Sequence, residues 1–113
     1  SAPPGLSRHH WGTDVDLNSL TMAYWETAAG QAALDWLEDN AKEYGYVMAY
    51  PPGRDAGPSY EPWHWSYRPL SQPLLRDFQR YVTENAIKGF VGAGQVRRLD
   101  WLKFVFGVNE SLK

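Results

Sequence analysis

Two short segments of the chain, residues 7–16 and 61–65, hold side chains that could do metal-dependent chemistry. Together they contain all three histidines of the sequence, with two aspartates and one glutamate. Imidazole and carboxylate are ligands that suit zinc, and a nearby glutamate that does not bind the metal is what a zinc hydrolase needs. The two segments therefore predict a metal site, and they suggest hydrolysis.

The candidate metal ligands are His9, His10, Asp14, Asp16 and His64. A catalytic zinc keeps three protein ligands and leaves one position for water, so one histidine and one aspartate of the first segment would join the histidine of the second. The two adjacent histidines point in different directions, and we expect only one to bind. The two aspartates share one face of a strand, so strand geometry does not separate them. The remaining aspartate could orient a ligand imidazole from behind.

Glu61 is the candidate general base, which would take a proton from the attacking water and pass it to the leaving amine. In an ideal strand, Glu61 and His64 would point to opposite faces because they are three residues apart. Pro62 cannot donate to a strand ladder, so we expect the regular strand to begin after it, with Glu61 on the preceding bend. A lone histidine beside a tryptophan is usually a packing residue, but two such motifs in one small chain argue against that interpretation.

Short strands and helices are expected to position these groups. The strands are predicted over residues 13–17, 46–50 and 63–67. The helices are predicted over residues 31–44, 71–83 and 95–106, the last with Val96, Leu99, Leu102 and Phe106 on its apolar face. Ser71 would cap the second helix, and Gly45 and Gly107 would end the first and the third. This order of elements predicts an α+β fold, in which a small antiparallel sheet carries the zinc site and packs against helices.

The composition of the chain excludes several kinds of partner and of metal site. The chain has 113 residues, the size of one domain, and its many aromatic residues (six Trp, seven Tyr, four Phe) can build a core. Its net charge is −2 with scattered basic residues, so no nucleic-acid partner is expected. There is no cysteine, which excludes cysteine-type zinc sites. No membrane span and no signal peptide are evident, and the oligomeric state is not predicted.

At the motif residues the chain resembles a known family. These residues are Ser7, His9, Gly12 and Asp16 in the first segment, then Glu61, Trp63 and His64 in the second. Their order and spacing are similar to the signature of the VanY-type D-alanyl-D-alanine carboxypeptidases. These enzymes belong to a metallopeptidase group that also includes lysostaphin-like enzymes and the hedgehog signalling domain. The resemblance covers nearly the whole chain, since residues 87–90 and 106–109 look like the family's usual ending.

The resemblance implies a zinc ion held by His9, Asp16 and His64, with Glu61 as the general base. It implies hydrolysis of a peptide bond ending in D-alanine, in a bacterial cell-wall (peptidoglycan) stem peptide. Zinc would polarise the scissile carbonyl while its water attacks. The expected location is the bacterial cell envelope, periplasmic or extracellular.

The resemblance also implies roles on the substrate side. Ser7 would lie near the substrate carboxylate or the metal water, and Trp63 would sit beside the groove. The family usually has a small residue where this chain has Asp14. We expect this extra carboxylate either to tune a ligand or the substrate's amine from outside the ligand set, or to face solvent.

A second departure from the family concerns the start of the chain. Family members have further sequence before the first motif, and it supplies an arginine that clamps the substrate's terminal carboxylate. Here only eight residues precede His9, and Arg8 is the candidate substitute. We therefore expect residues 1–113 to form a single zinc peptidase domain that lacks its N-terminal portion and has an incomplete substrate pocket.

Two alternatives to a zinc peptidase belong to other classes of protein. The first is a zinc-containing module that binds peptidoglycan or a protein without cleaving it, as the hedgehog branch suggests by analogy. Such a module has no need of a base, so Glu61 favours the enzyme. The second is an aromatic carbohydrate-binding domain without metal, which would fit the tryptophan content but would leave the spacing of histidines and aspartates unexplained.

Overall fold

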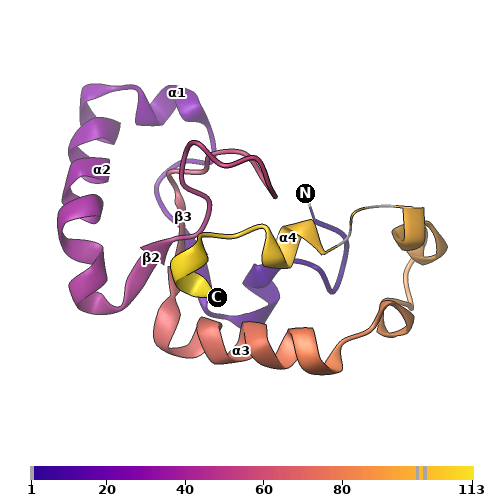
Figure 1. The fold of residues 1–113 in the computed structure, drawn as a ribbon. Helices are drawn as coiled ribbons and strands as arrows, with labels where there is room; N and C mark the ends of the chain where they lie inside the picture. Colours follow the sequence, from indigo (N-terminus) through magenta and orange to yellow (C-terminus); the bar gives the residue numbers. More distant parts are fainter. Residues whose placement is uncertain (1, 99, 101) are drawn as a thin grey trace.

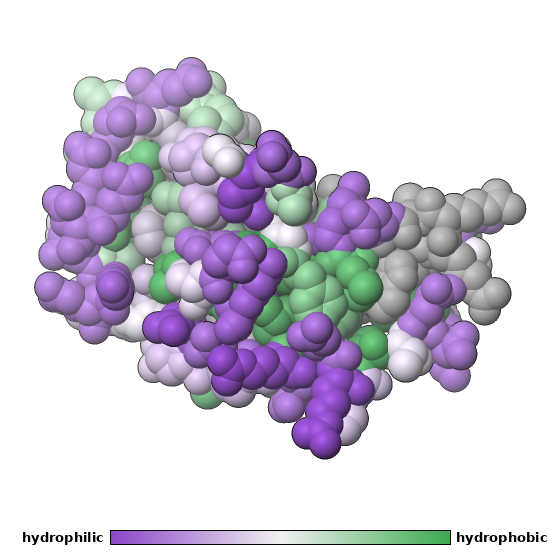
Figure 2. Space-filling model, viewed as in Figure 1, coloured by the Kyte–Doolittle hydropathy of each residue, from purple (hydrophilic) through white to green (hydrophobic). Residues whose placement is uncertain are grey.

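The computed structural model describes residues 2–98, 100 and 102–113. A small antiparallel sheet with helices around it confirms the predicted α+β class (Figure 1). Polar residues cover most of the face seen in Figure 2, and apolar residues show near its middle. The arrangement of the sheet explains how the two motif segments meet.

The sheet places residues from the two motif segments opposite each other. Its strands are β1 (Asp14–Asp16), β2 (Tyr46–Met48) and β3 (His64–Tyr67), in the order β1-β3-β2. All pairings are antiparallel, with Asp16 opposite His64 and Asp14 opposite Ser66. Directly opposite residues of paired strands have their side chains on the same face. The two aspartates and His64 therefore share one face. This confirms the prediction that Asp14 and Asp16 lie on the same face of their strand.

Helices flank this sheet in the described part of the chain. The α-helices are α1 (Met22–Trp25), α2 (Ala28–Asn40), α3 (Arg68–Tyr81) and α4 (Lys103–Phe106). The 3-10 helices are η1 (Arg8–Trp11), η2 (Ala41–Tyr44), η3 (Glu84–Ala86), η4 (Ala93–Arg98) and η5 (Glu110–Leu112). In Figure 1, α2 runs along one side of the molecule and α3 runs along its lower edge. Among the described residues, none of these helices is long and apolar enough to cross a membrane.

Alternation along β3 directs its side chains into two apolar cores. Toward α1 and α2, the buried cluster contains Trp25, Leu34, Ala41, Met48 and Trp65. Toward α3, α4 and the end of the chain, the buried cluster contains Leu6, Ala49, Tyr50, Leu75, Phe78, Val105, Val108 and Leu112. His64 and Ser66 alternate with Trp65, so they face the second cluster. The candidate ligands thus lie beside a packed core that can hold them in place.

The first long helix starts earlier and ends earlier than predicted. Thr27 precedes α2, and the backbone N–H of Gly30 donates to Thr27 Oγ1 at 3.1 Å, which caps the helix. After Asn40 the chain tightens into η2, and Gly45, with a φ of 86°, ends it as predicted. The short helix α1 lies just before Thr27, in a segment for which no helix was predicted.

The second helix begins before Ser71, so the prediction that Ser71 caps it is wrong. α3 starts at Arg68, directly after β3, and Pro69 stands in its first turn, where a missing N–H costs nothing. Ser71 is fully buried inside the helix, and its hydroxyl is hydrogen-bonded to that of Ser66 at 2.8 Å. In the sequence, a polar residue before an apolar stripe is typical of a helix cap. Here the Ser71 hydroxyl instead binds Ser66 in the neighbouring strand.

The predicted continuous helix over residues 95–106 is also wrong. The described residues form η4 and, after a non-helical Asp100, the short helix α4. Leu99, which was assigned to the apolar face of that helix, lies outside the described residues. The three strands lie where they were predicted, but each is shorter than its predicted range by one or two residues.

Candidate metal centre

His9 is positioned by the 3-10 helix η1 and by the first strand. Its backbone N–H donates to Ser7 Oγ at 3.2 Å, which caps η1. Gly12 ends η1 with a φ of 71°, a left-handed conformation that turns the chain into β1. His9 Nδ1 lies 3.0 Å from the backbone carbonyl oxygen of Asp14, so an Nδ1–H donates there. The other ring nitrogen, Nε2, is then available and faces Asp16 Oδ1 at 3.3 Å.

His64 and Asp16 complete a cluster with His9. The two stand opposite each other in the β1–β3 pair, with His64 Nδ1 3.9 Å from Asp16 Oδ1. The imidazole rings of His9 and His64 are stacked, with centroids 4.4 Å apart. Each of the three residues offers a ligand atom, and these atoms all lie within 4.8 Å of one another.

The spacing of these atoms fits a zinc ion. Zinc is bound tetrahedrally with bonds of about 2.1 Å to nitrogen and oxygen, which places ligand atoms roughly 3.4 Å apart. The separations of 3.3 Å and 3.9 Å at Asp16 Oδ1 lie close to this value. Two imidazoles and one carboxylate are also a donor set that zinc accepts while keeping a position free. His9, Asp16 and His64 therefore form a possible metal-binding group.

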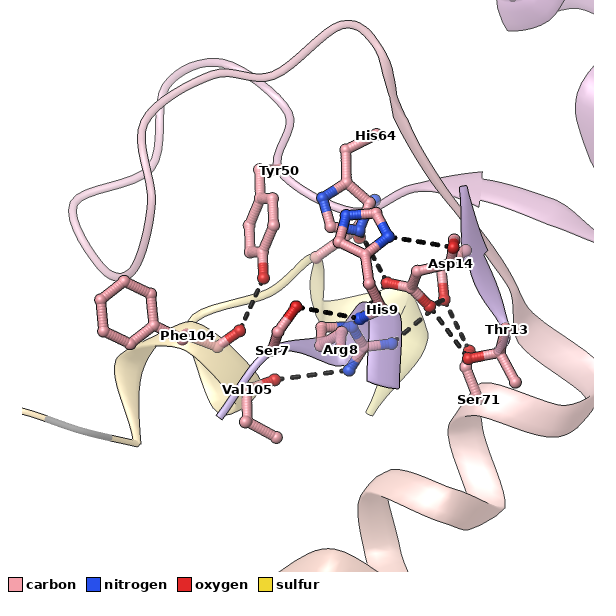
Figure 3. A network of polar contacts seen from close by, with 12 residues as sticks. Ser7, Arg8, His9, Thr13, Asp14, Tyr50, His64, Ser71, Phe104 and Val105 are labelled. Carbon is pink, nitrogen blue, oxygen red and sulfur yellow. Dashed lines mark hydrogen bonds and ion pairs between the residues drawn. The ribbon is translucent and has the colours of Figure 1, made fainter. Parts of the chain in front are cut away.

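Asp14 lies behind this group as a buried, fully engaged carboxylate (Figure 3). Its donors are His64 Nε2 at 2.8 Å, Arg8 Nε at 2.9 Å, Ser66 Oγ at 2.6 Å and Thr13 Oγ1 at 3.0 Å. Burial alone would raise the pKa of Asp14, but the hydrogen bonds of His64 and Ser66 and the charge of Arg8 outweigh it. Together they lower this pKa from 3.8 to about 2, so the carboxylate is ionised at neutral pH.

Asp14 thereby orients both histidines of the cluster. Its carboxylate accepts from His64 Nε2, and its backbone carbonyl accepts from His9 Nδ1. Each imidazole has one nitrogen engaged by Asp14, which leaves the opposite nitrogen directed at Asp16. Such contacts fix the tautomer and the orientation of metal-binding histidines. Burial would lower the pKa of His64, but the hydrogen bonds of Asp14 and Glu61 outweigh it and raise this pKa.

Glu61 lies on the bend before β3, as its neighbouring proline predicted. Its backbone N–H donates to the carbonyl of Tyr50, and its own carbonyl accepts from the N–H of His64. This bend turns the Glu61 side chain to the same side as His64 despite their spacing in sequence. Glu61 Oε2 lies 3.1 Å from His64 Nδ1, and the side chain is 26% exposed. The carboxylate thus borders the cluster and remains open to water.

A groove of about 700 Å³ opens over the cluster. Ser7, His10 and Glu61 are among its polar lining residues, and Leu20, Tyr50, Trp63 and Phe104 supply apolar surface. Sequence reasoning missed Tyr50, whose hydroxyl donates to the carbonyl of Phe104 at 2.6 Å and whose ring meets His64 edge-on at 4.9 Å. Burial raises the pKa of this hydroxyl well above its ordinary value. As the last residue of a predicted strand, Tyr50 carried no chemical signal in the sequence.

The Arg8 side chain is buried, whereas a side chain that clamps a substrate carboxylate would have to be accessible. Arg8 borders the groove, but its side chain has no exposed surface. The guanidinium donates to Asp14, to Ser66 Oγ at 3.1 Å and to the carbonyl of Val105 at 3.4 Å. Asp14 did not reveal this arrangement in sequence, because only its burial, which the sequence does not show, calls for a compensating cation. Ser66 could have been found, since it follows His64 by two residues and so shares its face.

The family profile and two relatives that match this chain carry the same description. The profile of the VanY family, described as D-alanyl-D-alanine carboxypeptidase, matches residues 1–70 and does not extend to the tail. A D-alanyl-D-alanine carboxypeptidase of Enterococcus faecium is 31% identical over 73% of this chain and 26% of its own length. One of Enterococcus faecalis is 35% identical over 58% of this chain and 24% of its own length.

A third relative differs in its reported activities. The bifunctional D-Ala-D-Ala dipeptidase and D-Ala-D-Ala carboxypeptidase VanXYC of Enterococcus gallinarum is 28% identical over 74% of this chain and 47% of its own length. The chain thus spans about a quarter of the length of the first two relatives. No solved structure matches the chain.

Proposed function

The chain belongs to the VanY family of D-alanyl-D-alanine carboxypeptidases, and from this premise we propose that it is a zinc-dependent D,D-carboxypeptidase domain. Its substrates would be bacterial cell-wall stem peptides that end in D-Ala-D-Ala, and it would act in the cell envelope. Relatives with this activity in their names support the substrate class. The proposal extends over residues 1–113 as one domain.

One observation carries the proposal: three ligand atoms of suitable type and spacing meet beside a carboxylate that is not among them. His9 Nε2, Asp16 Oδ1 and His64 Nδ1 would hold the ion. Zinc in such a site acts as a Lewis acid and makes water nucleophilic near neutral pH. Glu61 stands at the border of the cluster, where a general base is needed.

Glu61 would move the proton. Its carboxylate would accept a proton from the attacking water and then donate it to the nitrogen of the departing D-alanine. Its partial exposure lets it reach both water and substrate. Glu61 lies outside the proposed ligand set, so its carboxylate would be available to carry the proton in both steps.

The other side chains would position and shelter the reacting groups. Asp14 would keep both imidazoles oriented through its two contacts. Ser7 and Trp63 line the groove and would contact the peptide near the scissile bond. Tyr50 and Phe104 line the groove and would exclude water from one wall, since the Tyr50 hydroxyl donates to the Phe104 carbonyl and the Tyr50 ring packs against His64.

The test is direct. The zinc-loaded chain would be incubated with a peptide ending in D-Ala-D-Ala, and the products followed by mass spectrometry. We expect loss of one alanine residue from the peptide and no loss from an otherwise identical peptide ending in L-Ala-L-Ala. Intact peptide after prolonged incubation, with zinc shown to be bound, would refute the enzyme. Peptide binding without cleavage would then favour the non-catalytic module.

A further inference from the structure

Arg8 joins three distant parts of the chain beneath the cluster. It belongs to η1, yet its side chain is directed inward and is fully buried. Its three nitrogens donate to Asp14 Oδ2 in β1, to Ser66 Oγ in β3 and to the carbonyl of Val105 in α4. Figure 3 shows the contacts of Arg8 with Asp14 and Val105. The carbon at the centre of the guanidinium lies 4.8 Å from the centre of the Trp11 ring. Such a fork of fixed donors cannot be reproduced by a lysine.

Arg8 and His64 donate hydrogen bonds to the same oxygen of the Asp14 carboxylate. Asp14 Oδ2 accepts from Arg8 Nε at 2.9 Å and from His64 Nε2 at 2.8 Å. The second oxygen, Oδ1, is held by the hydroxyls of Thr13 and Ser66. The carboxylate therefore has little freedom to rotate. The direction in which Nε2 of His64 must point is set by this oxygen.

We propose that Arg8 is a positioning residue that acts through Asp14 to make Nδ1 the metal-binding nitrogen of His64. This inference rests on the proposed metal site. A histidine presents one nitrogen to a metal when the other donates its hydrogen to a fixed acceptor. With Nε2 donating to Asp14, Nδ1 is the nitrogen that would offer a lone pair to a metal. It faces Asp16 and lies 3.1 Å from Glu61 Oε2. Arg8 keeps that acceptor in place and compensates its charge.

The test compares metal binding in folded variants. Zinc affinity would be measured by chelator competition, and the ligand geometry by the visible spectrum of the cobalt-substituted protein. We expect Arg8→Lys to weaken zinc binding by about 10- to 100-fold, the usual effect of losing an outer partner of a metal ligand. The cobalt spectrum should change as well, because the His64 ring is no longer fixed. Arg8→Lys with wild-type affinity and spectrum would overturn the proposal.

Arg54 offers a matched control. It too donates to several groups, the carbonyls of Pro51, Ala56, Pro58 and Gly107. It has no contact with Asp14 or with the three candidate ligands among the described residues. We expect Arg54→Lys to lower thermal stability while leaving zinc affinity in the folded protein and the cobalt spectrum unchanged. A loss of affinity equal to that of Arg8→Lys would show that Arg8 acts only by general stabilisation.

A double variant covers the case in which a single Arg8 substitution prevents folding. Arg8→Met with Asp14→Ala removes both buried charges together, which costs less than leaving one unpaired. We expect this protein to fold but to remain weak in zinc binding, because His64 has lost its acceptor. Wild-type zinc affinity in the folded double variant would overturn the proposal. Absence of zinc binding in the unmodified chain would instead refute the proposed function, so the two failures are distinguishable.

Discussion

Glu61 borders the candidate metal centre, but it is not one of the three candidate ligands. Its carboxylate touches His64 at one edge of the cluster but belongs to a bend outside the strand. The three candidate ligands come from η1, β1 and β3, and each is tied by a hydrogen bond or by strand pairing. A change at Glu61 should therefore affect proton transfer while leaving the ligand set intact.

Replacement of Glu61 by glutamine tests this separation. Glutamine keeps the shape of the side chain but cannot take up the proton, so we expect kcat to fall by about 10² to 10⁴-fold. Bound zinc, measured by metal analysis, should stay at the wild-type level. Turnover close to that of the wild type would reject Glu61 as the base, and loss of zinc would indicate that it is a ligand.

At the scale of elements, the most predictable parts were those fixed by local signals. The strand around Asp14 and Asp16 and the bend at Pro62 followed from alternation and from the missing N–H of proline. Ser71 was not predictable, because its burial depends on Ser66 across the β3–α3 connection. The split between η4 and α4 was also missed, since helical spacing of apolar residues does not reveal a break.

The start of α2 supplies a prediction for a single element. Thr27→Ala removes the hydroxyl that accepts from the N–H of Gly30 and donates to the carbonyl of Tyr24. Loss of such a cap costs about 1 kcal/mol of the free energy of unfolding, which urea denaturation can measure. Thr83→Ala is the control, because Thr83 is likewise exposed and precedes η3 without a capping side-chain hydrogen bond. Equal effects of the two substitutions would argue against the cap.

At the scale of the whole molecule, the site joins segments that are far apart in sequence. The residues of the first motif meet His64 through strand pairing, and Arg8 reaches Val105 near the end of the chain. The ligand candidates could be identified from the sequence because motif spacing and strand alternation are local. The burial of Arg8 could not, because it depends on where α4 packs. The same holds for Tyr50, whose partner is Phe104.

Because the proposed zinc ion would bind only the folded chain, it should stabilise the whole domain. Free zinc at about 100 times its Kd would add about 2.7 kcal/mol to the free energy of unfolding, or roughly 10 °C in Tm for a chain of this size. His9→Ala should abolish this shift. His10→Ala should retain it, since His10 is outside the cluster and its Nδ1 accepts from the N–H of Gly5. Equal shifts for both variants, measured by calorimetry, would contradict the assignment.

Diffraction from crystals grown with zinc, recorded at the zinc absorption edge, would examine the ligand set itself. The expected result is a single strong anomalous peak about 2.0 to 2.2 Å from His9 Nε2, Asp16 Oδ1 and His64 Nδ1, with Glu61 beside it and not bound. A peak at other side chains, coordination through His64 Nε2, or no peak in a zinc-saturated crystal would contradict the account.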